Sequence, residues 1–213
     1  MRLGAPTPAA CPHCAQRSTL QQASSGNTRD AAWWSDGVLR GPMWPRPQPL
    51  LCCSGCGALV WQHALLLLPP GEAGADQRLP TWAEPTPARI WQALDAGEVT
   101  DAAAARRMQL LAWQRVNDNL CWRQAAHGGL ARPEDAAAGA PPHRLRLLNA
   151  ALQGDDATER LRKAEVLRQL GRFEQAQAVL QQIQDPAFAE WVQHLALLCS
   201  RGQTQLARMP LAC

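Results

Sequence analysis

The sequence of 213 residues predicts an α+β protein that is mostly α-helical, with a small β module followed by a helical domain. Three observations predict this order. The first 60 residues hold five of the eight cysteines and seven of the seventeen prolines, a composition typical of short strands and turns. Two C-x-x-C pairs lie in the same region. The last 70 residues, in contrast, carry apolar residues at helical spacing almost throughout. Such a shift in composition indicates a domain boundary.

The β module is organised around two cysteine turns. Cys11 and Cys14 form the first cysteine turn, and Cys53 and Cys56 form the second. Each C-x-x-C turn lets two sulfur atoms face one ion, and two such turns supply the four thiolates of a tetrahedral zinc site. The sequence therefore predicts a structural Zn²⁺ held by Cys11, Cys14, Cys53 and Cys56, with no other cofactor.

Neighbouring residues leave some alternatives open. Cys52 could replace Cys53 as a ligand, but Cys52 and Cys56 have C-x-x-x-C spacing, which makes Cys53 the preferred choice. His13 and His63 are weaker candidates and are expected to be surface or strand residues. A redox dithiol is disfavoured because neither cysteine turn opens a helical pattern. The other thiols are expected to be buried or incidental: Cys121, Cys199 and Cys213.

The 38 residues between the two cysteine turns must leave Cys14 and return beside it, which predicts a β-hairpin or meander. The Ser35-Asp36-Gly37 triplet is a turn signal, and Asp36 is explained by that turn rather than by chemistry. Residues 58–61 are expected to form a strand after the second cysteine turn. Over residues 8–68 this pattern resembles a zinc ribbon, except that Ala15 stands where a glycine often follows the first turn.

Tryptophan and proline gather between the cysteine turns. Either they cover a thin core, which is the favoured interpretation, or they form an aromatic binding face. The residues concerned are Trp33, Trp34, Trp44, Pro42, Pro45 and Pro47.

The predicted modules follow the order of the chain. They are a zinc-binding module at 1–70, a linker at 71–86, a helical hairpin at 87–126, a flexible linker at 127–143 and a helical domain at 144–213. In the hairpin, Thr86 and Thr100 are the expected N-caps and Gly97 the expected C-terminal stop. Its arginines Arg106, Arg107 and Arg115 are expected on the solvent side.

The last domain carries the strongest helical signal. Asp156 and Glu159 form a capping-box pattern at the start of one helix, and Gly171 ends it. The spacing of Ala164, Leu167, Gly171, Phe173, Ala176 and Leu180 is similar to the tetratricopeptide-repeat signature, over one repeat at residues 157–190. The whole layout resembles uncharacterised bacterial proteins with an N-terminal zinc ribbon and a tetratricopeptide-like region. That resemblance implies a fold but no activity.

These features favour a zinc-binding adaptor protein that interacts with other proteins and has no catalytic activity. Four cysteines would close the zinc shell, and no phosphate loop, nucleophile elbow or metalloprotease motif occurs, so neither an enzyme nor a small-molecule substrate is expected. The net charge of +3 is too small to imply nucleic acid by itself.

Two other functions are compatible with the sequence. The first is nucleic-acid binding through the β module, with Arg106, Arg107, Arg115 and Arg123 contacting phosphates; a less favoured one is thiol redox sensing. The lack of a signal peptide or a long apolar run predicts a cytoplasmic protein that does not bind membranes.

Overall fold

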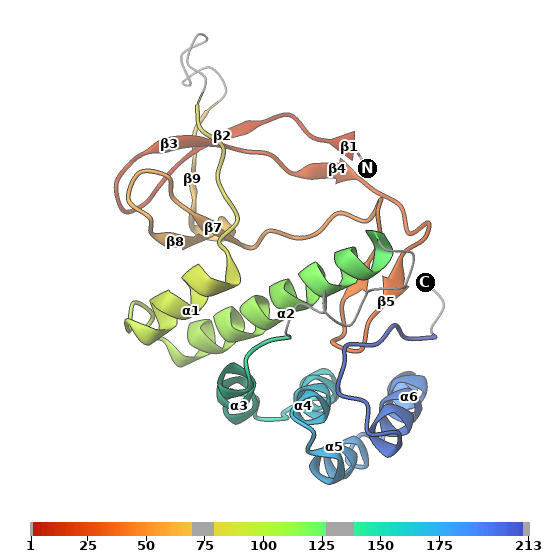
Figure 1. Cartoon of the computed structure of the whole chain (residues 1–213). Coiled ribbons are helices and arrows are strands. Elements are labelled where there is room, and N and C mark those ends of the chain that lie inside the picture. The colour runs from red at the N-terminus through yellow and green to blue at the C-terminus, as the bar shows by residue number, and fades with distance from the viewer. Residues whose placement is uncertain (1, 70–78, 127–138, 211–213) are drawn as a thin grey trace. The chain divides into compact units, whose positions relative to one another are not determined.

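The computed structural model describes residues 2–69, 79–126 and 139–210 (Figure 1). Within these ranges, small β-sheets in the first part precede six α-helices, which confirms the α+β class. No helix among the described residues is long and apolar enough to cross a bilayer. The chain divides into two compact units: Met1–Asp30 with Gly41–Arg89, and Ala31–Arg40 with Ile90–Cys213.

The first unit contains short, mostly antiparallel strands. β2 (Thr7–Ala10) pairs with β3 (Arg17–Leu20) on one side and with β9 (Leu66–Leu67) on the other. Two further pairs complete it: β1 (Arg2–Leu3) with β4 (Ala23–Ser25), and β7 (Leu50–Cys52) with β8 (Leu59–Trp61). β8 confirms the strand predicted at 58–61, and a 3₁₀ turn at Gln62–Ala64 follows it.

The core of the first unit is small. It contains Ala9, Cys11, Leu20, Leu51, Cys53, Val60, Leu65 and Trp82. Trp82 comes from a segment that runs beside two of the sheets, because Thr81 forms a bridge with Thr19 and Ala83 forms one with Cys52. This segment belongs to the predicted linker 71–86, of which residues 71–78 lie outside the described residues.

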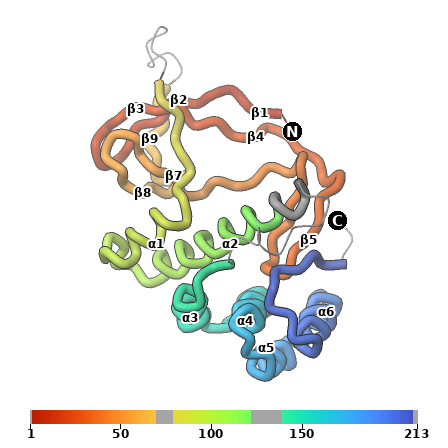
Figure 2. Tube along the Cα trace, in the orientation of Figure 1, coloured from red at the N-terminus to blue at the C-terminus, as the bar shows by residue number. Residues whose placement is uncertain are grey.

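The second unit combines a short hairpin with helices. β5 (Ala32–Trp33) pairs with β6 (Leu39–Arg40) through the predicted turn, where Trp34 N–H donates to the Val38 carbonyl at 3.1 Å and Gly37 has a φ of 78°. The hairpin was predicted within the zinc-binding module, whereas the structure groups residues 31–40 with the helices. Figure 2 shows β5 beside the segment that follows the last helix.

The helices of the second unit begin with α1 (Pro87–Asp95), whose first turn belongs to the first unit, and α2 (Ala102–Ala126). Thr86 caps α1 as predicted, since its hydroxyl accepts from Arg89 N–H at 3.2 Å. Asp101, and not the predicted Thr100, caps α2: its carboxylate accepts from Ala104 N–H at 2.7 Å. An aspartate one residue later offers a charged acceptor to the same orphan N–H groups.

Four more helices lie side by side in Figure 1: α3 (Pro142–Ala151), α4 (Ala157–Gln169), α5 (Phe173–Leu180) and α6 (Ala189–Ser200). A 3₁₀ turn at Pro186–Phe188 precedes α6. Of the predicted flexible linker 127–143, residues 127–138 lie outside the described residues, and α3 already begins at its Pro142.

The predicted capping box of α4 is present. Asp156 accepts from Glu159 N–H at 2.7 Å, and Glu159 in turn accepts from the N–H groups of Gly154 and Asp155. Gly171 ends this helix with a φ of 72°, as expected.

The helical unit has two clusters of buried side chains. One joins α2, α3 and α4 around Trp113, Leu148 and Val166. The other joins α4, α5 and α6 around Ala164, Ala176 and Leu195. Both clusters share α4, which is therefore the central helix of this unit.

Candidate metal centre

The two cysteine turns have the same backbone geometry. In the first, Ala15 N–H donates to the Cys11 carbonyl at 2.9 Å; in the second, Gly57 N–H donates to the Cys53 carbonyl at 2.9 Å. Each turn is closed by a further bond, from Cys11 N–H to the Gln16 carbonyl and from Cys53 N–H to the Ala58 carbonyl. The residue after each turn has a positive φ, 58° at Ala15 and 72° at Gly57. The alanine at position 15 therefore keeps the turn geometry that glycine usually provides.

This symmetry yields a paired prediction. The left-handed conformation costs an L-residue about 1–2 kcal/mol and costs glycine almost nothing. We therefore expect Ala15→Gly to raise the free energy of unfolding of the metal-loaded protein by about 1 kcal/mol, and Gly57→Ala to lower it by a similar amount. No atom lies within 4 Å of a Cβ built on Gly57, so backbone strain alone would cause the loss. Guanidinium unfolding curves of the two variants measure both effects, and destabilisation by Ala15→Gly would contradict this account.

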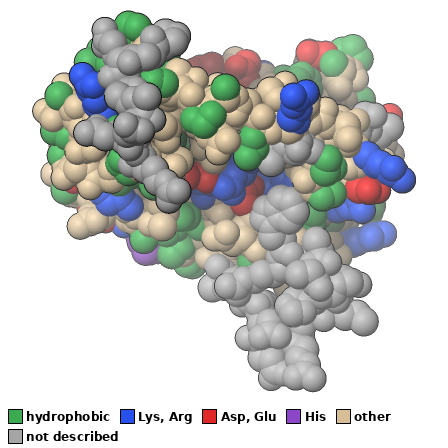
Figure 3. Space-filling view, turned by 90° about the horizontal axis from the view of Figure 1, so that it is seen from above, with side chains coloured by type: hydrophobic (Ala, Val, Ile, Leu, Met, Phe, Trp, Pro, Cys, Tyr) green, Lys and Arg blue, Asp and Glu red, His purple; other side chains and the backbone are tan. Residues whose placement is uncertain are grey.

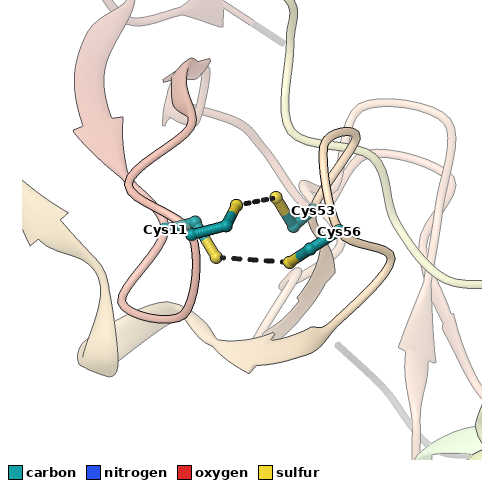
Figure 4. A group of neighbouring side chains, drawn as sticks. Cys11, Cys53 and Cys56 are labelled. Carbon is teal, nitrogen blue, oxygen red and sulfur yellow. Dashed lines mark hydrogen bonds between the residues drawn. The ribbon is translucent and has the colours of Figure 1, made fainter.

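The four predicted cysteines come together at the tips of the two turns (Figure 4). The Sγ atoms of Cys14 and Cys53 are 3.6 Å apart, and those of Cys11 and Cys56 are 3.9 Å apart. All four sulfur atoms lie within 4.8 Å of one another. A tetrahedron with metal–sulfur bonds of about 2.3 Å has sulfur–sulfur edges of about 3.8 Å, whereas a disulfide is about 2.05 Å long. The four thiols could hold a metal ion in tetrahedral geometry.

Each turn contributes one buried and one exposed cysteine to the four-sulfur group. Cys11 and Cys53 are each 1% exposed and belong to the core of the first unit, while Cys14 and Cys56 are exposed. The buried cysteines anchor the two turns against the strands, and the exposed ones close the cluster from outside. An ion bound here would tie both turns to the core.

The electrostatics of the cluster couple metal binding to pH. Burial opposes ionisation of Cys53, but the N–H groups of Cys56 and Gly55 outweigh it and lower the pKa of this thiol to about 7. The Gln16 N–H favours the Cys14 thiolate, yet the three neighbouring thiols and desolvation together raise the pKa of Cys14 to about 12. An ion bound here at neutral pH would displace at least the Cys14 proton, so we expect metal affinity to increase with pH.

Cys52 does not join the cluster. Its Sγ atom lies 3.7 Å from the Gly57 carbonyl oxygen, and the four-sulfur group contains Cys53 instead. Cys52 is the last residue of β7, and successive side chains on a strand point to opposite faces. The structure thus places Cys53, rather than Cys52, with the other three thiols.

The two histidines also lie outside the four-sulfur group. His13 is exposed, and His63 stacks on Trp61 with ring centroids 6.4 Å apart. The tryptophan and proline residues between the cysteine turns differ in burial, and none of the six is fully buried. Trp33 packs edge-on against Trp191 at 5.8 Å in the second unit, whereas Trp44 in the first unit is 37% exposed.

The arginines predicted on the solvent side of α2 differ in environment. Arg115 is only 7% exposed and pairs with Asp118 at 3.0 Å, so its predicted exposure is wrong. Arg106 pairs with Glu159 of α4 at 2.9 Å, while Arg107 is exposed. The side chain of Arg123 lies outside the described part of α2. Arg115 turns inward because the buried carboxylate of Asp118 lies one helical turn away.

Sequence reasoning missed a buried polar cluster around the hairpin of the second unit. Asp36, which the sequence explained by the turn alone, is completely buried. Its carboxylate binds both Nη atoms of Arg40 at 2.7 Å. Asn117 donates to the same carboxylate at 2.9 Å, and Arg40 Nε donates to Asp118 at 2.6 Å. The only local signal was the i,i+4 spacing of Asp36 and Arg40; the α2 partners lie about eighty positions away in the sequence.

No known protein family, curated protein or solved structure matches this chain.

Proposed function

We propose that this chain is a protein-interaction protein without catalytic activity, in which Cys11, Cys14, Cys53 and Cys56 hold a structural Zn²⁺. The four-thiol cluster is the observation that carries the proposal. A tetrahedral set of four sulfur ligands suits zinc, and zinc sites of this composition are structural. Catalytic zinc sites generally have three protein ligands and keep a position for water or substrate. Four thiolates at one ion would leave no such position.

The arrangement of α4 and α5 supports an interaction role for the second unit. Ala164 and Ala176 are 1% and 0% exposed, so the two helices approach closely through small side chains. Gly171 lies at the turn between them, and Arg172 N–H donates back to the Leu167 carbonyl at 2.9 Å. These are the positions at which the sequence is similar to a tetratricopeptide repeat, a module whose stacked helices display binding surfaces.

The arrangement of charge disfavours nucleic acid as the partner. Arg106 and Arg115 are engaged in ion pairs within the second unit. On the face shown in Figure 3, basic side chains are dispersed, and several adjoin acidic ones. Phosphate-driven binding requires clustered cations that replace counterions along the backbone.

Fluorescence anisotropy with a labelled duplex and a labelled single strand tests this choice. For the zinc-loaded full chain at 150 mM salt, we expect a dissociation constant weaker than about 10 µM for both, within the range of non-specific binding. Saturable binding well below that concentration, with affinity falling steeply as salt rises, would overturn the proposal in favour of a nucleic-acid-binding protein.

A further inference from the structure

The segment Gln203–Met209 follows α6 in the second unit, and its residues 207–209 lie along the edge of the hairpin at Trp33, Trp34 and Ser35 (Figure 2). Ser35 N–H donates to the Ala207 carbonyl at 2.8 Å, and Met209 N–H donates to the Trp33 carbonyl at 2.8 Å. Trp34 and Arg208 form an antiparallel bridge between them. The segment therefore adds a third, strand-like chain to the β5–β6 hairpin, on the side opposite β6.

A buried arginine of α4 holds the start of the same segment. Arg168 is 0% exposed, and its guanidinium donates to the carbonyls of Gln203 and Gln205, the latter at 2.8 Å. Glu165 orients this guanidinium by accepting from Nε and from Nη2, each at 2.7 Å. The arginine is thus fixed within its own helix and points its remaining donors at a backbone.

Ser35 links the hairpin to this ion pair. Its hydroxyl donates to Glu165 Oε1 at 2.8 Å and accepts from Ala207 N–H at 3.1 Å. Trp33, Ser35, Glu165 and Arg168 together form what we call the strand groove. All of these hydrogen bonds between the groove and the segment involve backbone N–H or carbonyl groups of the segment.

Only two side chains of the segment are deeply buried. Leu206 is 8% exposed and Met209 is 2% exposed, while Gln203, Thr204, Gln205 and Arg208 are exposed. Recognition therefore depends on an extended backbone and on two apolar anchors three positions apart. Strand addition to a sheet edge likewise takes its affinity from main-chain bonds. The two anchors here are three positions apart, so they differ from the alternate side chains that a regular strand presents to one face.

We propose that the strand groove is a peptide-binding site for which Gln203–Met209 is the built-in occupant. The partner is a protein that presents an extended peptide with two large apolar residues three positions apart, and this peptide enters in exchange for the internal segment. This inference rests on the proposed role in protein interaction and specifies where the partner binds. Because the internal segment is tethered, it competes at an effective concentration in the millimolar range, on the order of that for short linkers.

The probe is a labelled synthetic peptide with the sequence of residues 203–209, added to the full-length, zinc-loaded chain. The double substitution Leu206→Ser and Met209→Ser removes both apolar anchors of the internal occupant and so weakens its competition. This variant is therefore expected to bind the probe at least about 10-fold more tightly than the wild type. A probe with serine at both anchor positions serves as the control ligand. Thr204→Ala is the matched control variant, since this exposed side chain makes none of the contacts described, and it is expected to bind like the wild type.

Hydrogen exchange on the wild-type protein gives a second readout that needs no altered residue. Excess probe is expected to increase exchange at the Ala207 and Met209 amides of the chain, while the amides within α4 keep their protection. Equal binding by the double variant and the wild type, or unchanged exchange at both amides under saturating probe, would overturn the peptide site. Probe-independent dimers formed through exchange of the segment would also overturn it, because the groove would then serve a second copy of this chain.

Failure here is distinguishable from failure of the proposed function. Tight nucleic-acid binding would contradict the proposed function, whether or not the probe peptide binds. If neither nucleic acid nor probe binds, the strand groove alone is rejected, and the interaction role would depend on another surface.

Discussion

Removal of the metal is expected to unfold the first unit while the helices of the second unit stay folded. The strands described in the first unit are two to four residues long, and two of its eight core residues are metal-binding candidates, Cys11 and Cys53. Sheets this small are marginal by themselves, whereas zinc contributes about 10–16 kcal/mol of apparent binding free energy in small zinc peptides. The second unit has its own clusters of buried side chains and includes none of the four cysteines.

Hydrogen exchange before and after chelation measures this effect. The Leu51 and Val60 amides, on β7 and β8, are expected to lose protection when the metal is removed, and the amides of α4 and α5 are expected to keep it. Cys53→Ser should behave like the chelated wild type, while Cys52→Ser should behave like the untreated one, because the Cys52 sulfur lies outside the cluster. Retained protection in the first unit after complete removal of the metal would show that the metal is dispensable for folding.

The substitution Arg40→Met is expected to destabilise the second unit by about 3–5 kcal/mol, because it leaves the buried Asp36 carboxylate without its cation. Asp118 loses one bond but keeps its ion pair with Arg115. Arg40 makes a two-point contact with Asp36 and a further bond to Asp118, and both aspartates are 2% exposed or less. Desolvation opposes the guanidinium charge, but these carboxylates outweigh it and raise the pKa of Arg40. Methionine fills a similar volume and offers neither carboxylate a donor.

Urea unfolding followed by helical circular dichroism measures the loss. Asp95→Asn is the matched control, because Asp95 pairs with Arg144 at the surface and surface pairs contribute little. Adding Asp36→Leu to Arg40→Met should restore part of the stability, since one buried carboxylate then disappears together with its partner. If Arg40→Met costs no more than Asp95→Asn, the buried cluster does not stabilise the second unit.

Local signals in the sequence were sufficient for the cysteine turns and for several helix ends. The C-x-x-C spacing identifies four thiols that the structure brings within 4.8 Å of one another, because each pair shares one short turn. Thr86, Asp156 and Gly171 act where they were predicted, because a cap depends on atoms within four residues. Asp101 shows the limit of this reasoning: two adjacent polar residues can both cap, and the sequence does not rank them.

Contacts between residues far apart in the chain could not be predicted from the sequence. The 31–40 hairpin looked like part of the insertion between the cysteine turns, yet its Asp36 and Ser35 bind residues of α2 and α4. A turn signal predicts a hairpin but not the surface on which it packs. The inward position of Arg115 has the same cause, since a polar residue is buried only when a partner compensates the loss of water.

The metal content of the purified chain tests the central claim most directly. Elemental mass spectrometry should find one zinc per chain in the wild type and in Cys52→Ser, and none in Cys53→Ser. Zinc that persists in Cys53→Ser, or a wild-type chain that binds no zinc when it is supplied, would contradict the four-cysteine site on which the proposed function depends.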